Sequence, residues 1–193
     1  VPYWTAREAL EVEELPQSIV VLGGGVIGME FVSLFSTLGV DVTVVEMLPK
    51  ILGPMDEELS TELQQAFEKR KVKFHLSTKV TAVRDGKVIA EHEGEQLEIP
   101  FDKLLVSVGR RAVTDALGLE TVGVELNRGA IVVDEHLQTS VPGIYAVGDV
   151  NGVSMLAHTA AREGQVAVHH ITDYPDAMSY RAIPGIVYTD PEI

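Results

Sequence analysis

The chain has 193 residues, with 15 Lys and Arg against 29 Asp and Glu, so its formal net charge is −14. This acidic balance argues against nucleic acid and against an anionic membrane surface as partners, because both require clustered Lys and Arg. No run approaches the ~20 apolar residues of a membrane-spanning helix, and the N-terminus lacks the regions of a signal peptide, so we expect a cytoplasmic protein. Cysteine is absent, which excludes disulfides, thiolate metal sites and thiol chemistry within this chain.

The first part of the chain alternates apolar runs with helical patterns. A short helix over residues 6–12 precedes a continuous apolar run at 18–22, which is typical of a parallel strand covered on both faces. A helix is expected over residues 26–38, with Leu34 and Leu38 among its buried apolar residues. We then expect a strand at 40–46, a helix at 57–70 with Asp56 as N-cap, and a strand at 72–76. The order β-α-β-α-β is the half-unit of a Rossmann-like, doubly wound α/β sheet.

From Lys79 the apolar period changes to two, and Asp85-Gly86 and Glu93-Gly94 separate the runs. This pattern predicts an antiparallel β-meander with tight turns, followed by a buried strand at 104–108. Farther on we expect short strands at 131–133 and 144–147 and a helix over about 155–171. Adjacent histidines at 169–170 on that helix point about 100° apart, so we predict no metal site there or elsewhere.

Residues 23–28 have the sequence GGGVIG, which fits G-x-G-x-x-G. The pattern alone is weak evidence for a dinucleotide site. Here it closes a predicted strand, opens a predicted helix and is followed, 18 residues after Gly28, by Glu46 at the end of the next strand, which is the context of a dinucleotide-binding fingerprint. Gly23 permits the tight turn, Gly25 lets a pyrophosphate approach the backbone, and Gly28 lets helix and strand pack closely. The alternative is a strand–helix turn without a ligand, and the context on both sides favours the dinucleotide.

Glu46 indicates whether the cofactor is NAD or NADP. A carboxylate at this position accepts hydrogen bonds from the ribose hydroxyls of NAD and repels the 2′-phosphate of NADP. No arginine follows it, since the next residues are Met47, Leu48 and Pro49. We therefore predict NAD as the cofactor of this turn.

A second group of residues ends at Gly148-Asp149, where a predicted strand stops shortly before the last predicted helix. An aspartate at a strand end can accept a hydrogen bond from a ligand hydroxyl, and taken alone it equally well caps a turn. Together with the glycine motif, these residues make the chain resemble the pyridine nucleotide–disulfide oxidoreductases, and within that family the dihydrolipoyl dehydrogenases. The resemblance is carried by residues 23–30, 44–46, 107–111, 139–149, 155–158 and 184–192.

The resemblance implies roles for particular positions. NAD is expected to contact Gly23, Gly25, Val26, Ile27, Gly28, Glu46, Val80 and Gly109. Within this set, Glu46 would bind the adenosine ribose, Val80 would lie near the adenine and Gly109 near the nicotinamide end. FAD is expected to contact Asp149 through its ribityl chain, and its isoalloxazine would run beside Met155, Leu156, Ala157 and His158. Glu30 would be the flavin-side glutamate that pairs, in this family, with a lysine outside this sequence.

Other parts typical of the family are absent from this sequence, which has one glycine motif, no redox-active cysteine pair and no C-terminal His–Glu acid/base pair. We therefore expect a fragment. It would contain an NAD-binding domain at 1–112, a central, partial FAD/NAD(P)-binding-type domain that contacts FAD at 113–188, and the start of a dimerisation domain at 189–193.

For the parent protein, the resemblance implies an FAD-dependent enzyme that passes electrons from dihydrolipoamide through a disulfide and FAD to NAD⁺. Its partner would be the lipoyl domain of a 2-oxo acid dehydrogenase complex, and it would form a homodimer. The fragment is expected to bind NAD and to be inactive alone, and its own oligomeric state stays open. Two alternatives are another member of the family (mercuric reductase, transhydrogenase or a glutathione reductase-like enzyme) and a stand-alone NAD-binding module.

Overall fold

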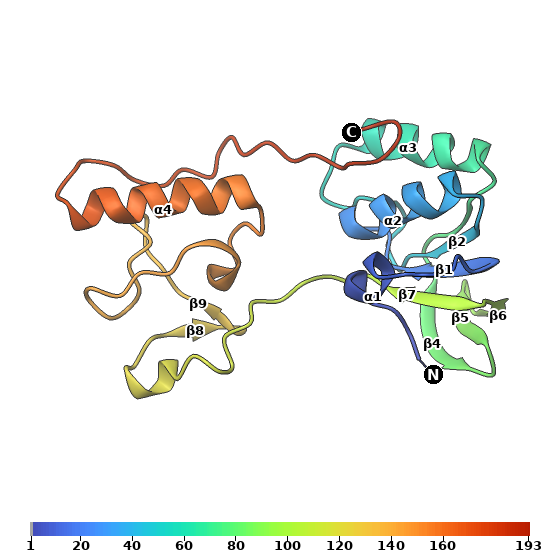
Figure 1. The fold of residues 1–193 in the computed structure, drawn as a ribbon, viewed down its shortest axis with the longest axis horizontal. Coiled ribbons are helices and arrows are strands. Elements are labelled where there is room, and N and C mark those ends of the chain that lie inside the picture. The colour runs from blue at the N-terminus through green and yellow to red at the C-terminus, as the bar shows by residue number, and fades with distance from the viewer. Residues whose placement is uncertain (1) are drawn as a thin grey trace. The chain divides into compact units, whose positions relative to one another are not determined.

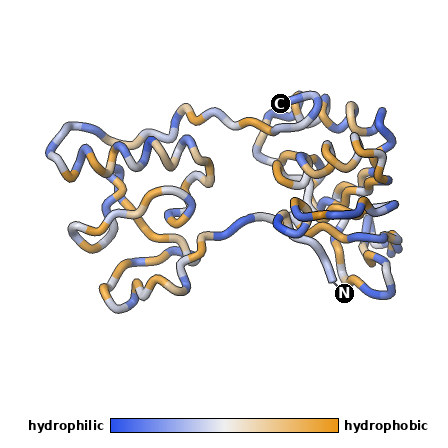
Figure 2. Tube along the Cα trace, viewed as in Figure 1, coloured by the Kyte–Doolittle hydropathy of each residue, from blue (hydrophilic) through white to orange (hydrophobic). Residues whose placement is uncertain are grey.

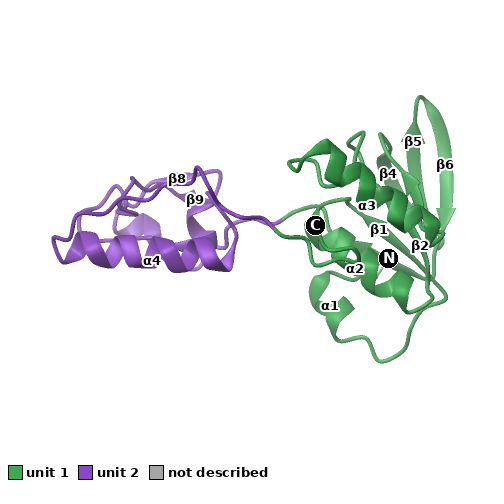
Figure 3. Cartoon of the chain, turned by 90° about the horizontal axis from the view of Figure 1, so that it is seen from above, with its two compact units in different colours: residues 1–109, 186–193 green, residues 110–185 purple. Residues whose placement is uncertain are grey.

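The computed structural model describes residues 2–193. The chain divides into two compact units, coloured separately in Figure 3. Unit 1 comprises the described residues up to Gly109 together with Ile186–Ile193, and unit 2 comprises Arg110–Gly185. The first break thus falls slightly before the predicted boundary at residue 112, and the return of 186–193 to unit 1 was not predicted. The chain alternates hydrophobic and hydrophilic stretches (Figure 2), and separate clusters of buried apolar residues lie in each unit.

Unit 1 is built on a four-stranded parallel sheet with the order β3-β2-β1-β7. The strands are β1 (Ser18–Leu22), β2 (Asp41–Val45), β3 (Lys73–His75) and β7 (Lys103–Val106). Two helices, α2 (Val26–Thr37) and α3 (Glu57–Lys69), lie on one side of this sheet (Figure 1). A short helix, α1 (Ala6–Leu10), precedes β1. These elements agree with the predicted α/β, Rossmann-like order.

Strand β1 is covered on both faces, as its continuous apolar sequence predicts. Ile19 and Val21 belong to the core formed with α2 and α3. Val20 and Leu22, which point to the other face because side chains alternate along a strand, belong to a second core that includes residues of the antiparallel strands. The sheet is therefore the middle layer of unit 1.

The second core is completed by the predicted antiparallel meander, which consists of β4 (Lys79–Arg84), β5 (Lys87–His92) and β6 (Glu95–Pro100). Asp85 and Gly86 both have positive φ, at 52° and 70°, and so do Glu93 and Gly94, at 51° and 85°. Two successive positive φ values are what a two-residue hairpin turn of type I′ requires. The Asp-Gly and Glu-Gly pairs therefore set the register of the meander.

Two predictions about burial and strands were wrong. Leu34 and Leu38 are 44% and 50% exposed, because α2 turns a face centred on Met29, Val32 and Phe35 towards the core. In unit 2 the predicted strand at 131–133 is reduced to the end of β9 (Ala130–Ile131), which pairs with β8 (Leu126–Asn127), and a bridge at Val133, and the predicted strand at 144–147 is reduced to a bridge at Tyr145. A strand needs a continuous partner, and among the described residues segment 144–147 finds only a short hairpin contact with 137–139.

Unit 2 also contains two single-turn helices, η1 (Leu119–Thr121) and η2 (Gly148–Asn151), and the long helix α4 (Ala157–Ile171). Apolar residues of α4 pack against Leu137 and Tyr145. The predicted helix was 155–171, so α4 begins two residues later than predicted and ends at the predicted residue.

Candidate dinucleotide-binding site

Unit 1 has a cavity of about 780 Å³ beyond the carboxyl ends of the parallel strands. In the sheet, β2 lies on one side of β1 and β7 lies on its other side. Such a reversal of strand order opens a crevice at the carboxyl ends of the strands, where ligands bind in doubly wound sheets. The cavity is lined by residues 22–27, 45–48, 53–54, 78–80 and 107–109.

The glycines of the motif serve different purposes. Gly23 has a φ of +104°, and a Cβ on it would overlap the carbonyl oxygen of Ser107 in the strand-end segment beside it. A Cβ on Gly28 would overlap the carbonyl oxygen of Gly23, so these two positions allow the turn and the close approach of helix and strand. A Cβ on Gly25 would meet no heavy atom within 4 Å, and Gly25 lines the cavity. The absence of a side chain there leaves room for a ligand rather than for the protein.

Gly25 is also the N-cap of α2, and within residues 2–193 no side chain caps the first turn of this helix. The first N–H groups of a helix lack partners within the helix, and together with the helix dipole they attract an anion. The open side of Gly25 and the first turn of α2 thus fit the diphosphate of a dinucleotide.

Glu46 is held in place by two backbone N–H groups of residues that line the cavity. Its Oε2 accepts a hydrogen bond from the Gly24 N–H at 2.6 Å, and its Oε1 accepts one from the Leu48 N–H at 2.7 Å. A carboxylate has about four acceptor positions, so these two bonds orient it and leave capacity for ribose hydroxyls. The sequence pattern identified Glu46, and the structure adds that the glycine turn itself orients it.

The cavity brings together most of the positions expected to contact NAD. Its lining includes Gly23, Gly25, Val26, Ile27, Glu46, Val80 and Gly109. Gly28 lies outside the lining, beneath the turn. Sequence reasoning missed Leu48, Thr78 and Lys79, which also line the cavity. Their presence depends on how the segments after β2 and before β4 approach the glycine turn, which no local pattern signals.

Glu30 lies on α2 outside the lining of this cavity. One of its carboxylate oxygens accepts a hydrogen bond from the Tyr188 N–H at 3.1 Å, and nearby the Ser33 hydroxyl accepts one from the Asp190 N–H at 3.0 Å. Both contacts attach the returning segment 186–193 to α2. The flavin-side role of Glu30 stays a prediction.

The positions expected to contact FAD lie in unit 2. Asp149 is in η2, and its Oδ2 lies 3.1 Å from Nη2 of Arg110. Met155 and Leu156 precede α4, and Leu156 is its N-cap without a side-chain hydrogen bond to the first turn. The ring of His158 contacts the carbonyl oxygen of Pro184 at 2.9 Å. A partly exposed aspartate and a helix start without a side-chain cap are groups that can meet hydroxyls and partial negative charge, so these residues fit the expected flavin contacts.

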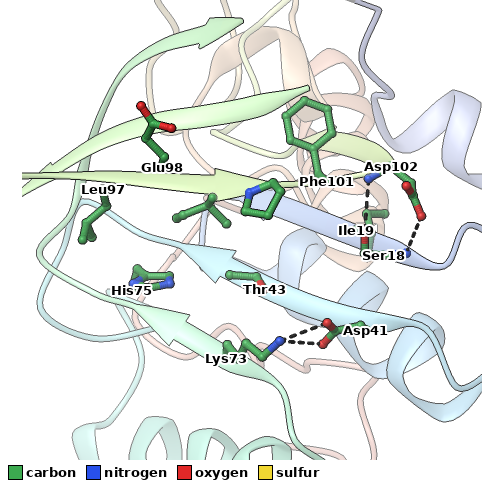
Figure 4. Close-up of a pocket in the computed structure, with 12 residues that line it drawn as sticks. Ser18, Ile19, Asp41, Thr43, Lys73, His75, Leu97, Glu98, Phe101 and Asp102 are labelled. Carbon is green, nitrogen blue, oxygen red and sulfur yellow. Dashed lines mark hydrogen bonds and ion pairs between the residues drawn. The ribbon is translucent and has the colours of Figure 1, made fainter. Parts of the chain in front are cut away.

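A second cavity of about 420 Å³ lies between the parallel sheet and the meander (Figure 4). Its charged groups are already paired. Lys73 donates to Asp41 at 2.9 Å, and the backbone and side chains of Ser18 and Asp102 bond to each other at 3.0 and 3.1 Å. Burial lowers the pKa of His75, which faces this space.

No cluster of three or more His, Asp or Glu side chains in residues 2–193 is arranged to hold a metal ion. In the same range, no helix has the combination of length and apolar character that crossing a bilayer requires.

Comparison with known proteins identifies the family. The sequence pattern of the pyridine nucleotide-disulphide oxidoreductases matches residues 1–164. The chain belongs to this family. The matched residues include the glycine turn, Glu46, Asp149 and the other positions expected to contact NAD or FAD.

Relatives in the family share this chain's sequence and fold. The dihydrolipoyl dehydrogenases of Halobacterium salinarum and Haloferax volcanii are 43% and 42% identical to it over its whole length, which spans 42% of each of them. Among solved structures, LpdA from Mycobacterium tuberculosis matches 97% of the chain with a TM-score of 0.87 and 33% identity, over 42% of its own chain. The flavoprotein disulfide reductase RclA from Escherichia coli matches 98% with a TM-score of 0.86 and 28% identity, over 44% of its own chain. The chain thus spans less than half the length of these relatives.

Proposed function

We propose that this chain provides the NAD-binding unit and part of the FAD-contacting unit of a dihydrolipoyl dehydrogenase, which reoxidises dihydrolipoamide with NAD⁺. The observation that carries the proposal is the cavity at the glycine turn, where Gly25 leaves space beside the first turn of α2 and the turn orients Glu46. The names of the relatives support the substrate. The lipoyl-domain partner, the homodimer and the cytoplasmic location belong to the same proposal.

The residues of unit 1 would hold NAD along the cavity. The N–H groups that open α2 bind the diphosphate beside Gly25, and the Glu46 carboxylate accepts hydrogen bonds from the adenosine ribose. Val80 contacts the adenine, and Gly109 lies towards the nicotinamide. In unit 2, Asp149 accepts a hydrogen bond from the ribityl chain of FAD, and residues 155–158 lie along its ring system. When bound, the flavin and the nicotinamide supply hydride transfer, and the protein supplies orientation and electrostatics.

Glu46 argues against the NADP-dependent members of the family. The 2′-phosphate of NADP would meet a carboxylate whose position is held by two backbone N–H groups, so Glu46 cannot easily turn away. The mercuric reductase and transhydrogenase alternatives differ from this proposal in substrate. The relatives' names favour dihydrolipoamide.

The test is calorimetric titration of the chain with NADH and NADPH, together with the variant Glu46→Gln. We expect NADH to bind more tightly than NADPH. A hydrogen bond to a charged group contributes about 1.5–3 kcal/mol, so Glu46→Gln should raise the Kd for NADH by about 10-fold or more. Glu57→Gln, at an exposed glutamate in the first turn of α3, is the matched control and should change neither value. Equal binding of the two nucleotides by the unmodified chain would contradict the proposal.

A second candidate function is a stand-alone NAD-binding module without chemistry of its own. The residues of unit 2 that fit a flavin, Asp149 and 155–158, argue against it because such a module has no use for them. Flavin absorbance of the purified full-length protein distinguishes the two. A colourless protein that binds NADH would favour the module.

A further inference from the structure

One buried charged side chain of unit 2 has no part in the site described so far. Glu163 lies on α4 and is 0% exposed. Its Oε2 accepts hydrogen bonds from the Gly148 N–H at 2.5 Å and from the Asn151 side-chain amide at 2.9 Å. Its Oε1 accepts one from the Tyr180 hydroxyl at 2.7 Å. All three partners donate, which suits a carboxylate because this group only accepts.

The hydrogen bonds from Gly148 and Asn151 join Glu163 to both ends of η2, the single helical turn that carries Asp149. The turn is tightly constrained. Gly148 has a φ of +77°, and a Cβ on it would lie 3.2 Å from the Cβ of Ala160 on α4. Gly152, just after the turn, has a φ of +69°. The backbone around Asp149 therefore passes close to α4 and is attached to it through one carboxylate.

The third partner secures the carboxylate from the other side. Tyr180 belongs to the segment that follows α4, and burial, followed by the neighbouring Glu163, raises the pKa of its hydroxyl. The Tyr180 hydroxyl therefore keeps its proton and donates a hydrogen bond to Glu163. With both oxygens of Glu163 occupied, rotation of the carboxylate would break at least one buried hydrogen bond. A buried donor left without a partner is costly.

We propose that Glu163 is a positioning residue that fixes the backbone of η2 so that Asp149 presents its carboxylate to the flavin. The inference rests on the proposed function, because it gives Asp149 the role of flavin contact. Arg110, which pairs with Asp149, restrains the side chain of Asp149, whereas Glu163 restrains its main chain. The action of Glu163 is geometric and depends on the reach of its side chain.

The test measures FAD binding by the full-length flavoprotein, by titrating the apoprotein with FAD and following flavin fluorescence. Glu163→Gln keeps the length of the side chain and an oxygen for Gly148 and Asn151, while its amide can donate to Tyr180. Glu163→Asp keeps the charge but withdraws the carboxylate by one methylene. We expect the Asp variant to raise the Kd for FAD by about 10- to 100-fold, since buried donors lose their partner. We expect the Gln variant to stay within about 5-fold of the unmodified protein because it loses only charge assistance.

Asp149→Asn and the double variant show whether Glu163 acts through Asp149. If it does, Glu163→Asp should add less than about 2-fold to the Kd in the Asp149→Asn background, because coupled residues are not additive. NADH binding, which belongs to unit 1, should be unchanged in every variant and reports that unit 1 is folded, and circular dichroism reports whether the helical content of the variant is retained. Glu62→Asp, at an exposed position of α3, is the matched control.

The outcomes separate the two proposals. If Asp149→Asn does not weaken FAD binding, the flavin role of Asp149 is wrong and the inference fails with it. If Asp149→Asn weakens FAD binding while Glu163→Asp does not, the proposed function stands and the positioning role of Glu163 is overturned. Effects of the two substitutions that multiply in the double variant, or a Gln variant that binds FAD as poorly as the Asp variant, would also overturn it.

Discussion

Substitution of Gly25 should separate dinucleotide binding from folding. Gly25 has φ of −77° and ψ of −179°, a backbone conformation that any residue adopts, and a Cβ there meets no heavy atom within 4 Å. In Gly25→Ala, the poorer N-cap costs about 1 kcal/mol. The lower entropy of the unfolded chain offsets about 0.4–1 kcal/mol of this. The free energy of unfolding should therefore change by less than about 1 kcal/mol.

Binding should respond quite differently. The added methyl group occupies the space through which a diphosphate reaches the first N–H groups of α2. Loss of one hydrogen bond to a charged oxygen corresponds to about 1.5–3 kcal/mol, so the Kd for NADH should rise by about 10- to 100-fold. Calorimetric titration with NADH gives the Kd, and thermal unfolding followed by circular dichroism gives the stability of the same preparation.

Gly28→Ala is the matched comparison because it adds the same methyl group one turn away. There the Cβ overlaps the carbonyl oxygen of Gly23, and such overpacking costs about 1–3 kcal/mol of stability. The reasoning would be refuted if Gly25→Ala bound NADH as tightly as the unmodified chain. It would also be refuted if Gly25→Ala lost as much stability as Gly28→Ala, since the space beside Gly25 would then be filled.

Three further predictions concern stability. Hydrogen bonds from Arg162 hold the pKa of the Asp176 carboxyl well below its usual range. The Tm of Asp176→Asn should therefore be lower than that of the unmodified chain at pH 7, and this difference should shrink as the pH falls below about 4. A difference in Tm that does not depend on pH would contradict this. Burial lowers the pKa of His75, so the folded chain favours the neutral imidazole. The stability that this gives should be lost as the pH falls below about 6.5. His75→Gln should therefore lose less Tm than the unmodified chain between pH 7 and pH 5.5. Val187, which is 0% exposed, anchors the returning segment in the core of unit 1, so Val187→Ala should lower the free energy of unfolding by about 2 kcal/mol. The exposed neighbour Ile186, changed to Ala, should stay within about 0.5 kcal/mol in the same denaturant titration.

Several features could be read from the sequence because they depend on short stretches of chain. The apolar run at 18–22 predicts a strand covered on both faces, and Ile19 and Val20 indeed belong to different cores. The Asp-Gly and Glu-Gly pairs predict the hairpin turns of the meander because few residues accept positive φ. The pattern G-x-G-x-x-G, followed by Glu46, predicts the dinucleotide crevice because its spacing reflects one strand–helix turn and the end of the next strand.

Tertiary structure decided the features that join segments distant in sequence. Leu34 and Leu38 are apolar but exposed, because the direction in which α2 packs is set by the sheet and not by its own composition. Segment 144–147 has the composition of a strand but no continuous partner among the described residues. Val187 returns to the core of unit 1, and Glu163 meets Gly148 from another element. Side-chain chemistry and periodicity specify what a segment can form, whereas burial and hydrogen-bond partners depend on which distant segments are brought against it.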